Sequence, residues 1–354
     1  MKIFLITDTH AGARSDSDHL HLFFDKFYTE IFFPYLLEHN ITFGIHLGDM
    51  FEKRKNIDFS TLHKTRKYLF DKLPEHNIKM DVIVGNHDSR FRDIISVNSP
   101  DLLLKDYIGS GHIRVYSTPT EVTIDGTNIL YMPWICPDTY DLSTELLKTS
   151  DCNILLGHLE ISGFEMHRGS IHHGGISSSM FSNFGVVYSG HFHHRSTKGN
   201  VTYLGTPYET CWADYNDPKG FHIFDTDTLE LIFVENPYKL FHKIVYDDSE
   251  WSEYPDDNLD FSYLKNTYIK LLVDNKTNSG WFDRFVSNIE QASPIDLQII
   301  EDTLNMVSSD DEINVTEDTI SILNKSVMEF DTKVNKTKLN NLFSSLYTES
   351  MYME

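Results

Sequence analysis

Five short polar motifs, each directly after an apolar run, constrain this chain more than any other feature of its sequence. The runs at 3–6, 43–47, 82–84, 154–156 and 186–188 are short and apolar, which is typical of buried strands in an α/β sheet. Ligands of such folds gather at the carboxyl ends of the strands, so we expect the five loops to converge in space. The motifs are Asp8-Thr9-His10, Gly48-Asp49, Gly85-Asn86-His87-Asp88, Gly157-His158 and Gly190-His191-Phe192-His193.

The residue types in these motifs predict a site for two divalent metal ions. Carboxylate, imidazole and amide oxygen suit divalent transition ions, and no thiolate takes part. In the last motif, His191 and His193 stand at positions i and i+2, which face opposite sides of a regular strand. On a glycine-led loop, such a pair can serve two adjacent ions instead of one. A single histidine is weak evidence, but five motifs in this order favour a metal site.

The motif set resembles that of the calcineurin-like metallophosphoesterase superfamily, and within it the SbcD-type nucleases of DNA double-strand-break repair. The superfamily motifs cover residues 1–195, and similarity to the branch extends to about residue 235. This resemblance implies an α/β fold, a four-layer sandwich of two mixed β-sheets flanked by helices, with a small α+β capping domain and C-terminal helices. The segments that resemble the branch are Met1 to His10, Leu204-Gly205-Thr206-Pro207-Tyr208 and Asn216-Asp217-Pro218-Lys219-Gly220-Phe221.

The resemblance also implies which residues bind the metal ions. We expect two Mn²⁺ per chain, because nitrogen and oxygen ligands without sulfur accept this ion, although Mg²⁺, Fe²⁺ or Zn²⁺ could occupy the same positions. Two adjacent ions would activate a water molecule and clamp the phosphate oxygens during hydrolysis. The implied ligands are Asp8, His10 and His193 for the first ion, Asn86, His158 and His191 for the second, and Asp49 as the bridge.

His87 is the residue that we expect to act as the general acid. It stands beside the amide ligand and cannot easily share its ion, while a cleaved phosphodiester releases an alkoxide that needs a proton. The neighbouring Asp88 either orients an imidazole or caps its own loop backbone, and the sequence leaves both roles open. His46 lies inside an apolar run and is expected in the core or just behind the site. Many nucleases of this branch carry a histidine three residues after the second-motif aspartate, whereas this chain has Glu52, which leaves the balance of exonuclease and endonuclease activity open.

The charge of the chain is unusual for a protein that binds DNA. Its formal net charge is −23, and an acidic protein repels a polyanion. Residues 51–100 are locally basic, with 7 acidic and 10 basic residues, and several of these cations flank the second and third motifs, where a DNA backbone would pass. The three basic residues from Lys64 to Lys67 could instead be the solvated face of a helix. Because tight DNA binding by such a chain alone is not expected, we expect a partner to supply part of the affinity. The basic residues include Lys53, Arg54, Lys55, Lys64, Arg66, Lys67, Arg90 and Arg92.

Three domains are expected: a nuclease domain at 1–240, a DNA-capping domain at 241–307, and an acidic linker with C-terminal helices at 308–354. The first domain should contain crossover helices at 20–38 and 59–73, strands near 113–116, 121–124 and 128–132, and a hairpin turn at Asp125-Gly126-Thr127. We expect an acidic linker at 247–260, followed by a strand at 267–273, a helix at 281–289 and a strand at 295–300.

The tail carries two candidate amphipathic helices, at about 317–330 and 338–352. Periodicity alone slightly favours packing of these helices onto the capping domain. The resemblance implies instead that they clasp the base of the coiled coil of an SbcC-type ATPase. It also implies a homodimer of this chain within a heterotetramer.

These expectations combine into a Mn²⁺-dependent DNA exonuclease or endonuclease, one subunit of an ATPase-coupled complex for recombination and double-strand-break repair. The alternatives are a small-molecule phosphodiesterase or protein phosphatase on the same fold, and a non-catalytic binding scaffold. The complete ligand set argues against the scaffold. No apolar stretch approaches the ~20 residues of a membrane span. An immediate N-terminal strand and three widely spaced cysteines lead us to expect a reducing cytoplasm, without a signal peptide.

Overall fold

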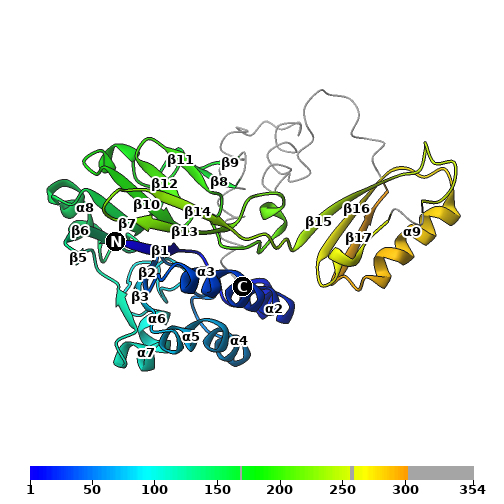
Figure 1. Ribbon diagram of the computed structural model, residues 1–354. Coiled ribbons are helices and arrows are strands. Elements are labelled where there is room, and N and C mark those ends of the chain that lie inside the picture. The colour runs from blue at the N-terminus through cyan, green and yellow to red at the C-terminus, as the bar shows by residue number, and fades with distance from the viewer. Residues whose placement is uncertain (168–169, 256–258, 302–354) are drawn as a thin grey trace, which may run out of the picture. The chain divides into compact units, whose positions relative to one another are not determined.

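The structure of the chain is a computed structural model that describes residues 1–167, 170–255 and 259–301 (Figure 1). The chain divides into two compact units, residues 1–299 and 300–354. The second unit lies almost entirely outside the described residues. The first contains two large sheets, a three-stranded sheet and a two-stranded one.

Two six-stranded mixed sheets form the body of the first unit. In the first sheet, β1 (Lys2–Ile6), β2 (Phe43–His46), β3 (Lys79–Ile83) and β4 (Ile113–Tyr116) are parallel, while β13 (Gly220–Asp225) and β14 (Leu231–Glu235) extend it antiparallel in the order β14-β13-β1-β2-β3-β4. In the second, β6 (Thr127–Met132), β7 (Ile154–His158), β10 (Val186–Gly190) and β12 (Val201–Tyr203) are parallel. The edge strands β5 (Thr120–Ile124) and β11 (Ser196–Lys198) are antiparallel, and the order is β11-β12-β10-β7-β6-β5.

Alternation along the strands builds the expected four layers. Leu5 lies in the core between the two sheets, whereas its neighbour Phe4 packs under the helices of the first sheet. In the second sheet, Leu156 lies in the core between the sheets, whereas its neighbour Leu155 packs on the outer face. The sandwich architecture predicted from the sequence is therefore confirmed.

Helices cover the outer face of the first sheet (Figure 1). The expected helix at 20–38 is continuous as α2 (Asp18–Phe27), η1 (Tyr28–Phe32) and α3 (Phe33–Glu38), with η1 a π-helical turn. The expected helix at 59–73 is α4 (Phe59–Thr65), the π-helical η2 (Arg66–Phe70) and α5 (Lys72–Glu75), and the Asp58 carboxylate caps its start by accepting from Ser60 and Thr61 N–H. Further helical elements are α6 (Ser99–Leu103), α7 (Lys105–Gly109), α8 (Tyr140–Thr149), η3 (Ser178–Phe181), η4 (Trp212–Asp214), η6 (Ser262–Leu264) and the short turn α1 (Ala13–Asp16).

The predicted hairpin turn joins β5 to β6. Asp125 and Gly126 both have positive φ, 47° and 81°, as a tight two-residue hairpin turn requires. A second small hairpin pairs β8 (Glu165–His167) with β9 (Ser170–Ile171).

A small α+β element follows the two large sheets. It consists of β15 (Phe241–Asp247), β16 (Tyr268–Asn275), α9 (Ser279–Gln291) and β17 (Asp296–Ile300), with the sheet order β15-β16-β17. The prediction of a linker at 247–260 that leads into this element is wrong. Because β15 already pairs in parallel with β16, the segment between them connects two strands inside the element instead of leading into it.

The two predicted C-terminal helices lie outside the described residues. The three domains, with boundaries at 240 and 307, remain predictions. Within the described part of the chain, no helix has both the length and the apolar character needed to cross a membrane.

Candidate metal centre

All five motif loops leave neighbouring strand ends. The first three follow β1, β2 and β3, which are adjacent in the first sheet, and the last two lie at the ends of β7 and β10, which are adjacent in the second. The two sets meet across the sandwich, because His158 Nδ1 donates to the Leu47 carbonyl oxygen at 2.8 Å. The seven predicted ligands therefore lie together, although nothing in their local sequence fixes this.

The first group of ligand atoms comes from Asp8, His10 and His193. These atoms all lie within 4.8 Å of one another. The Nε2 atoms of His10 and His193 are 3.0 Å apart, and His10 Nε2 lies 3.9 Å from an Asp8 carboxylate oxygen. Two imidazole nitrogens that face each other so closely need a proton or a cation between them.

The second group centres on the amide oxygen of Asn86. This oxygen lies 2.9 Å from His158 Nε2 and 2.9 Å from His191 Nδ1. Because Nδ1 of His158 donates to a backbone carbonyl, its Nε2 carries the lone pair in the neutral ring. Two acceptors then face each other, which is unfavourable without a cation.

Asp49 lies between the two groups. Its Oδ2 is 3.3 Å from His158 Nε2 and 4.0 Å from His10 Nε2, and its Oδ1 accepts the backbone N–H of His87 at 2.7 Å. One carboxylate therefore reaches ligands of both groups, which is the position of a bridge.

Burial and mutual charge set the electrostatics of the centre. Burial alone would lower the pKa of His10, but the carboxylates of Glu52, Asp49 and Asp8 raise it to about 10. Burial opposes ionisation of Asp49 as well, yet His158 and His87 hold its pKa well below the usual value. For Asp8, burial dominates and the pKa is raised. Such a concentration of buried carboxylates and imidazoles favours the binding of a cation.

Backbone strain accompanies the ligand loops. Asp8, His10 and Asp49 have left-handed φ values of 51°, 42° and 53°, and His191 has a φ of 94°. Such conformations are uncommon outside glycine and concentrate at functional sites. Glycine at position 190 lets the backbone of the last motif lie close to the first motif, because a Cβ there would lie 2.0 Å from Thr7 Oγ1 and 2.8 Å from an Asp8 carboxylate oxygen.

His87 lies beside the first group without joining either predicted ligand set. Its Nδ1 donates to the carbonyl oxygen of Glu52 at 2.7 Å, which leaves Nε2 for the exchangeable proton. Its ring packs edge-on against His10, with ring centroids 5.0 Å apart. His10, Glu52 and His87 form a third group with ligand atoms within 4.8 Å, and no motif of the sequence indicated the Glu52 side chain as part of it.

The two open questions about Asp88 and His46 are answered by their contacts. Asp88 accepts the backbone N–H groups of Met50, Phe51 and Gly85 at 2.9, 3.2 and 3.0 Å. It therefore fastens the second-motif and third-motif loops together and orients no imidazole. His46 is fully buried, accepts the Gly48 N–H and contacts Thr9 Oγ1 at 2.9 Å, and burial lowers its pKa to about 3.

A buried lysine behind the centre is a feature that the sequence analysis did not single out. Lys219 is 2% exposed and lies 2.8 Å from carboxylate oxygens of both Asp214 and Asp217. It donates to the carbonyl oxygen of His193 at 2.8 Å. Burial alone would lower the pKa of Lys219, but the two carboxylates raise it. The signal was present, because Lys219 lies in the Asn216–Phe221 segment that resembles the nuclease branch.

Three of the basic residues near the second motif form ion pairs within the fold. Lys53 pairs with Asp16 at 2.6 Å, Lys64 with Asp18, and Arg66 with Asp106 at 2.8 Å. For Lys64 and Arg66, which lie in the α4–η2 helix, the structure favours a solvated helix face over a DNA track.

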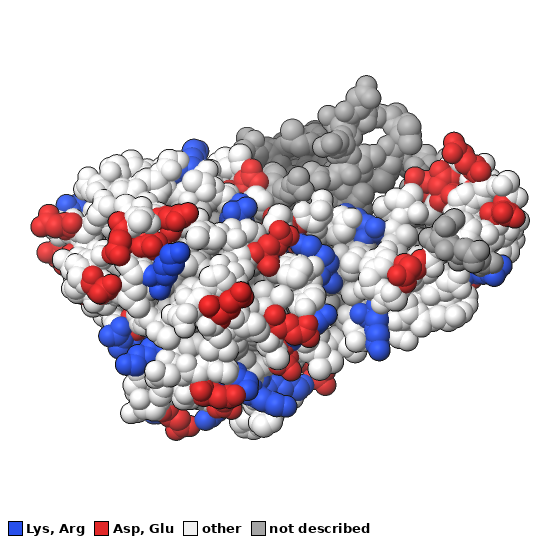
Figure 2. Space-filling model, in the orientation of Figure 1, with Lys and Arg blue, Asp and Glu red and all other residues white. Residues whose placement is uncertain are grey.

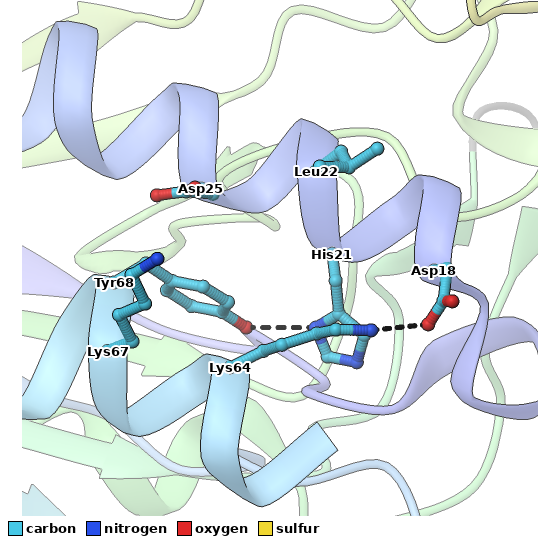
Figure 3. Close-up of a pocket in the computed structure, with 7 residues that line it drawn as sticks. All are labelled: Asp18, His21, Leu22, Asp25, Lys64, Lys67 and Tyr68. Atoms are coloured by element: carbon cyan, nitrogen blue, oxygen red, sulfur yellow. Dashed lines mark hydrogen bonds and ion pairs between the residues drawn. The ribbon is translucent and has the colours of Figure 1, made fainter. Parts of the chain in front are cut away.

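A cavity of about 310 Å³ lies between α2 and the α4–η2 helix (Figure 3). The Lys64 and Asp18 side chains meet across it, and Tyr68 Oη lies 3.4 Å from His21 Nδ1 at its floor. None of the predicted metal ligands lines this cavity, so it is separate from the metal centre.

The donor set fits divalent metal ions. It combines imidazole nitrogens, carboxylate oxygens and one amide oxygen, without sulfur, and it contains facing acceptors that only a cation or proton reconciles. These residues could hold two ions, one in each of the first two groups.

Comparison with known proteins agrees with this chemistry. Residues 1–195 match the calcineurin-like phosphoesterase family. The chain belongs to this family and is a metal-dependent phosphodiesterase with a mixed α/β sandwich fold. A relative is exonuclease subunit 1 of Enterobacteria phage T4, which is 31% identical over 324 residues, 91% of each chain. The sequence also led us to expect a resemblance to the recombination endonuclease subunit of T-even-like phages, and this relative confirms it.

Three solved structures show more distant similarity. A novel archaeal phosphodiesterase has a TM-score of 0.33 at 14% identity, covering 67% of this chain and 100% of its own. A dimetal phosphatase from Danio rerio has a TM-score of 0.36 at 11% identity, covering 63% and 91%. The nuclease MPE of Pseudomonas putida has a TM-score of 0.28 at 15% identity, covering 64% and 86%.

Proposed function

We propose that this chain is the nuclease subunit of a DNA recombination and double-strand-break repair complex, hydrolysing phosphodiester bonds with two Mn²⁺ ions. The observation that carries the proposal is the position of Asp49, which contacts ligands of both groups and the His87 backbone. The similarity to a phage protein named as an exonuclease subunit supports DNA as the substrate and a complex as the working form.

The residues of the centre would divide their roles between the two ions. Asp8, His10 and His193 would hold one ion, Asn86, His158 and His191 the other, and Asp49 would bridge them. When bound, the two ions supply an activated water and clamp the phosphate oxygens of the substrate. The buried Thr7, Asp88 and Lys219 keep the ligand loops in place through hydrogen bonds to Asp8, to three backbone N–H groups and to the His193 carbonyl.

His87 would protonate the leaving alkoxide. Its Nδ1 is committed to the Glu52 carbonyl, so a doubly protonated ring would release the proton from Nε2. A positioned proton donor of this kind contributes about 10²–10⁴-fold to the rate.

The remaining assignments rest on the sequence. Residues 241–307 would form a domain that restricts which DNA shapes reach the centre. Residues 308–354 would bind an SbcC-type coiled-coil ATPase, in a heterotetramer that contains two copies of this chain. A net charge of −23 supports the need for such a partner in DNA binding.

A nuclease assay on linear and hairpin DNA with Mn²⁺, with and without the candidate ATPase, tests the proposal. We expect slow cleavage by the chain alone and faster cleavage with the partner and ATP, and no cleavage by Asp49→Ala. Hydrolysis of a nitrophenyl phosphodiester without any cleavage of DNA under either condition would point to a small-molecule phosphodiesterase instead.

A further inference from the structure

Two lysines stand side by side on the small three-stranded sheet without a carboxylate partner. Lys243 on β15 is directly opposite Lys270 in the register with β16. Neither forms an ion pair within 4.0 Å with any of residues 1–167, 170–255 or 259–301. Like charges placed opposite each other are destabilising in a sheet. Burial, and next the charge of Lys270, lower the pKa of Lys243.

Each of these two ammonium groups lies over an aromatic ring. Lys243 Nζ lies 4.7 Å from the centre of the Tyr215 ring, and Lys270 Nζ lies 4.4 Å from that of Trp212. Both rings are half-buried and belong to the segment around η4. Cation–π contacts attract each lysine to its ring, but they do not cancel the repulsion between the two lysines.

The same aromatic cluster extends to Arg14. The Trp212 ring packs on Phe241, with centroids 4.8 Å apart, and Phe241 stacks on Tyr268 at 5.3 Å. The guanidinium of Arg14 lies 4.5 Å from the centre of the Tyr268 ring. Arg14 is exposed and is a third cation in contact with this aromatic cluster; in the sequence it follows the predicted ligand His10 by four residues.

The aromatic cluster is also connected to the predicted metal ligands through η4. Trp212 belongs to the same short helix as Asp214, which pairs with Lys219 at 2.8 Å. Lys219 donates in turn to the carbonyl oxygen of His193, a predicted metal ligand. Contacts through Trp212, Asp214 and Lys219 therefore connect the lysine pair to the first group of predicted ligands.

Uncompensated cations are notable in a chain with a net charge of −23. On the face drawn in Figure 2, acidic and basic side chains form small scattered groups without a broad basic surface. A small group of cations that form no ion pair among the described residues can engage a polyanion on such a surface.

We propose that Lys243 and Lys270, with Arg14, bind consecutive phosphodiester groups of a DNA strand whose scissile bond lies at the metal centre. This inference rests on the proposed nuclease function and adds the residues that hold the backbone. Phosphate oxygens between the two ammonium groups would relieve their repulsion. Since the contacts are to the backbone alone, binding would be independent of base sequence.

The test is the salt dependence of DNA binding in EDTA, where hydrolysis cannot interfere. For duplex DNA, each phosphate contact contributes about 0.9 to the slope of log K against log salt. The Lys243→Gln/Lys270→Gln double variant should lower this slope by about 1–2 and weaken binding equally for unrelated sequences. The Lys243→Arg/Lys270→Arg variant, which keeps both charges, should retain most of the slope and serves as the check on folding.

Lys276→Gln provides a matched control. Lys276 belongs to the same element and also lies over an aromatic ring, 3.9 Å from the centre of Phe282, but it has no lysine opposite it in the sheet register. Its slope should equal that of the unchanged protein. An unchanged slope in the Gln double variant, or an equal decrease in Lys276→Gln, would overturn the inference.

Inorganic phosphate separates a backbone site from a site for the free anion. If the Gln double variant loses inhibition of nitrophenyl phosphodiester hydrolysis by phosphate while its DNA slope is unchanged, the lysines bind free phosphate and the inference is wrong. The proposed function fails by a different result, namely no cleavage of DNA by the unchanged protein with Mn²⁺ and partner.

Discussion

Oε2 of Glu52 lies 2.7 Å from Nδ1 of His10, on the side of the ring away from the metal group. The contact is short but is not aligned as a hydrogen bond. Burial opposes the negative charge of Glu52, yet His10 lowers the pKa of this carboxyl to about 2. Glu52 thus occupies the sequence position of the branch histidine and contacts the predicted metal ligand His10, as carboxylates behind ligating histidines do.

Glu52→Gln should weaken Mn²⁺ binding at the His10 ion about 10–100-fold, because loss of the carboxylate leaves the imidazole less basic and less well oriented. Calorimetric titration of the metal-free protein with Mn²⁺ measures this. Glu75→Gln is the control, since Glu75 pairs only with Lys72 among its described ion pairs, at 2.7 Å. Equal Mn²⁺ affinity in the two variants would exclude an orienting role for Glu52.

Asp49→Ala should abolish hydrolysis and reduce the number of bound Mn²⁺ ions below two per chain. The carboxylate is the group that reaches both histidine sets, at 3.3 and 4.0 Å. Metal stoichiometry by calorimetry and circular dichroism of the metal-free variant separate loss of the site from loss of the fold. Two bound ions with near-normal turnover would show that another residue bridges the ions.

His87→Ala should keep both ions but lose about 10²-fold or more of the rate on DNA, since the leaving alkoxide then departs without a proton donor. Hydrolysis of a nitrophenyl phosphodiester, whose leaving group needs no proton, should fall much less. The ratio of the two losses at unchanged metal content is the decisive quantity. Equal losses on both substrates would argue against general-acid catalysis by His87.

Acid should destabilise the metal-free protein partly through His222. This residue is 2% exposed, neither ring nitrogen has a partner in the described structure, and burial, then Arg195, lowers its pKa from 6.5 to about 3. Below pH 6.5 the unfolded chain therefore binds a proton at the His222 imidazole that the folded chain does not bind. The stability of the fold is unaffected above pH 6.5 and falls as the pH drops toward 3. At pH 5 the loss is about 2 kcal/mol.

Urea unfolding of the metal-free protein at pH 7 and pH 5 measures this loss. His222→Leu should lose less stability between the two pH values than the unchanged protein, by about 2 kcal/mol. His39→Leu, at an exposed position, should lose as much as the unchanged protein. A pH dependence that His222→Leu does not reduce would mean that other groups take up the proton.

Truncation before Lys338 should leave metal binding and basal Mn²⁺ activity intact while removing stimulation by the ATPase. This prediction rests on the sequence alone, because the segment lies outside the described residues. Burial of Leu342, Phe343 and Leu346 against a partner would contribute several kcal/mol, at about 25 cal/mol per Å² of apolar surface. Co-purification and normal stimulation of the truncated chain would assign the tail to another role.

The strands, their ends and the polar motifs could be predicted from sequence because each depends on residues close together in the chain. Apolar runs of three to five residues indicate a buried strand, and a polar motif, in four of the five cases led by glycine, marks its end. The turn at Asp125-Gly126 is equally local, since both residues tolerate the positive φ that it needs. Convergence of the five motif loops was predicted from a general property of α/β sheets, and the structure brings these loops together. The roles of the individual side chains as metal ligands remain predictions.

Only the tertiary structure decided contacts between residues that are distant in sequence. The approach of Glu52 to His10, the three N–H groups that Asp88 accepts and the ion pairs of Lys53 and Lys64 depend on how loops cross in space. The pairing of Lys243 with Lys270 depends on the register of β15 against β16. Alternation of apolar and polar residues assigns each side chain to a face of the sheet, but it does not say which residue of the neighbouring strand lies opposite. The sequence by itself determines the chemistry of each side chain, but the packing of the whole fold determines which residues that side chain contacts.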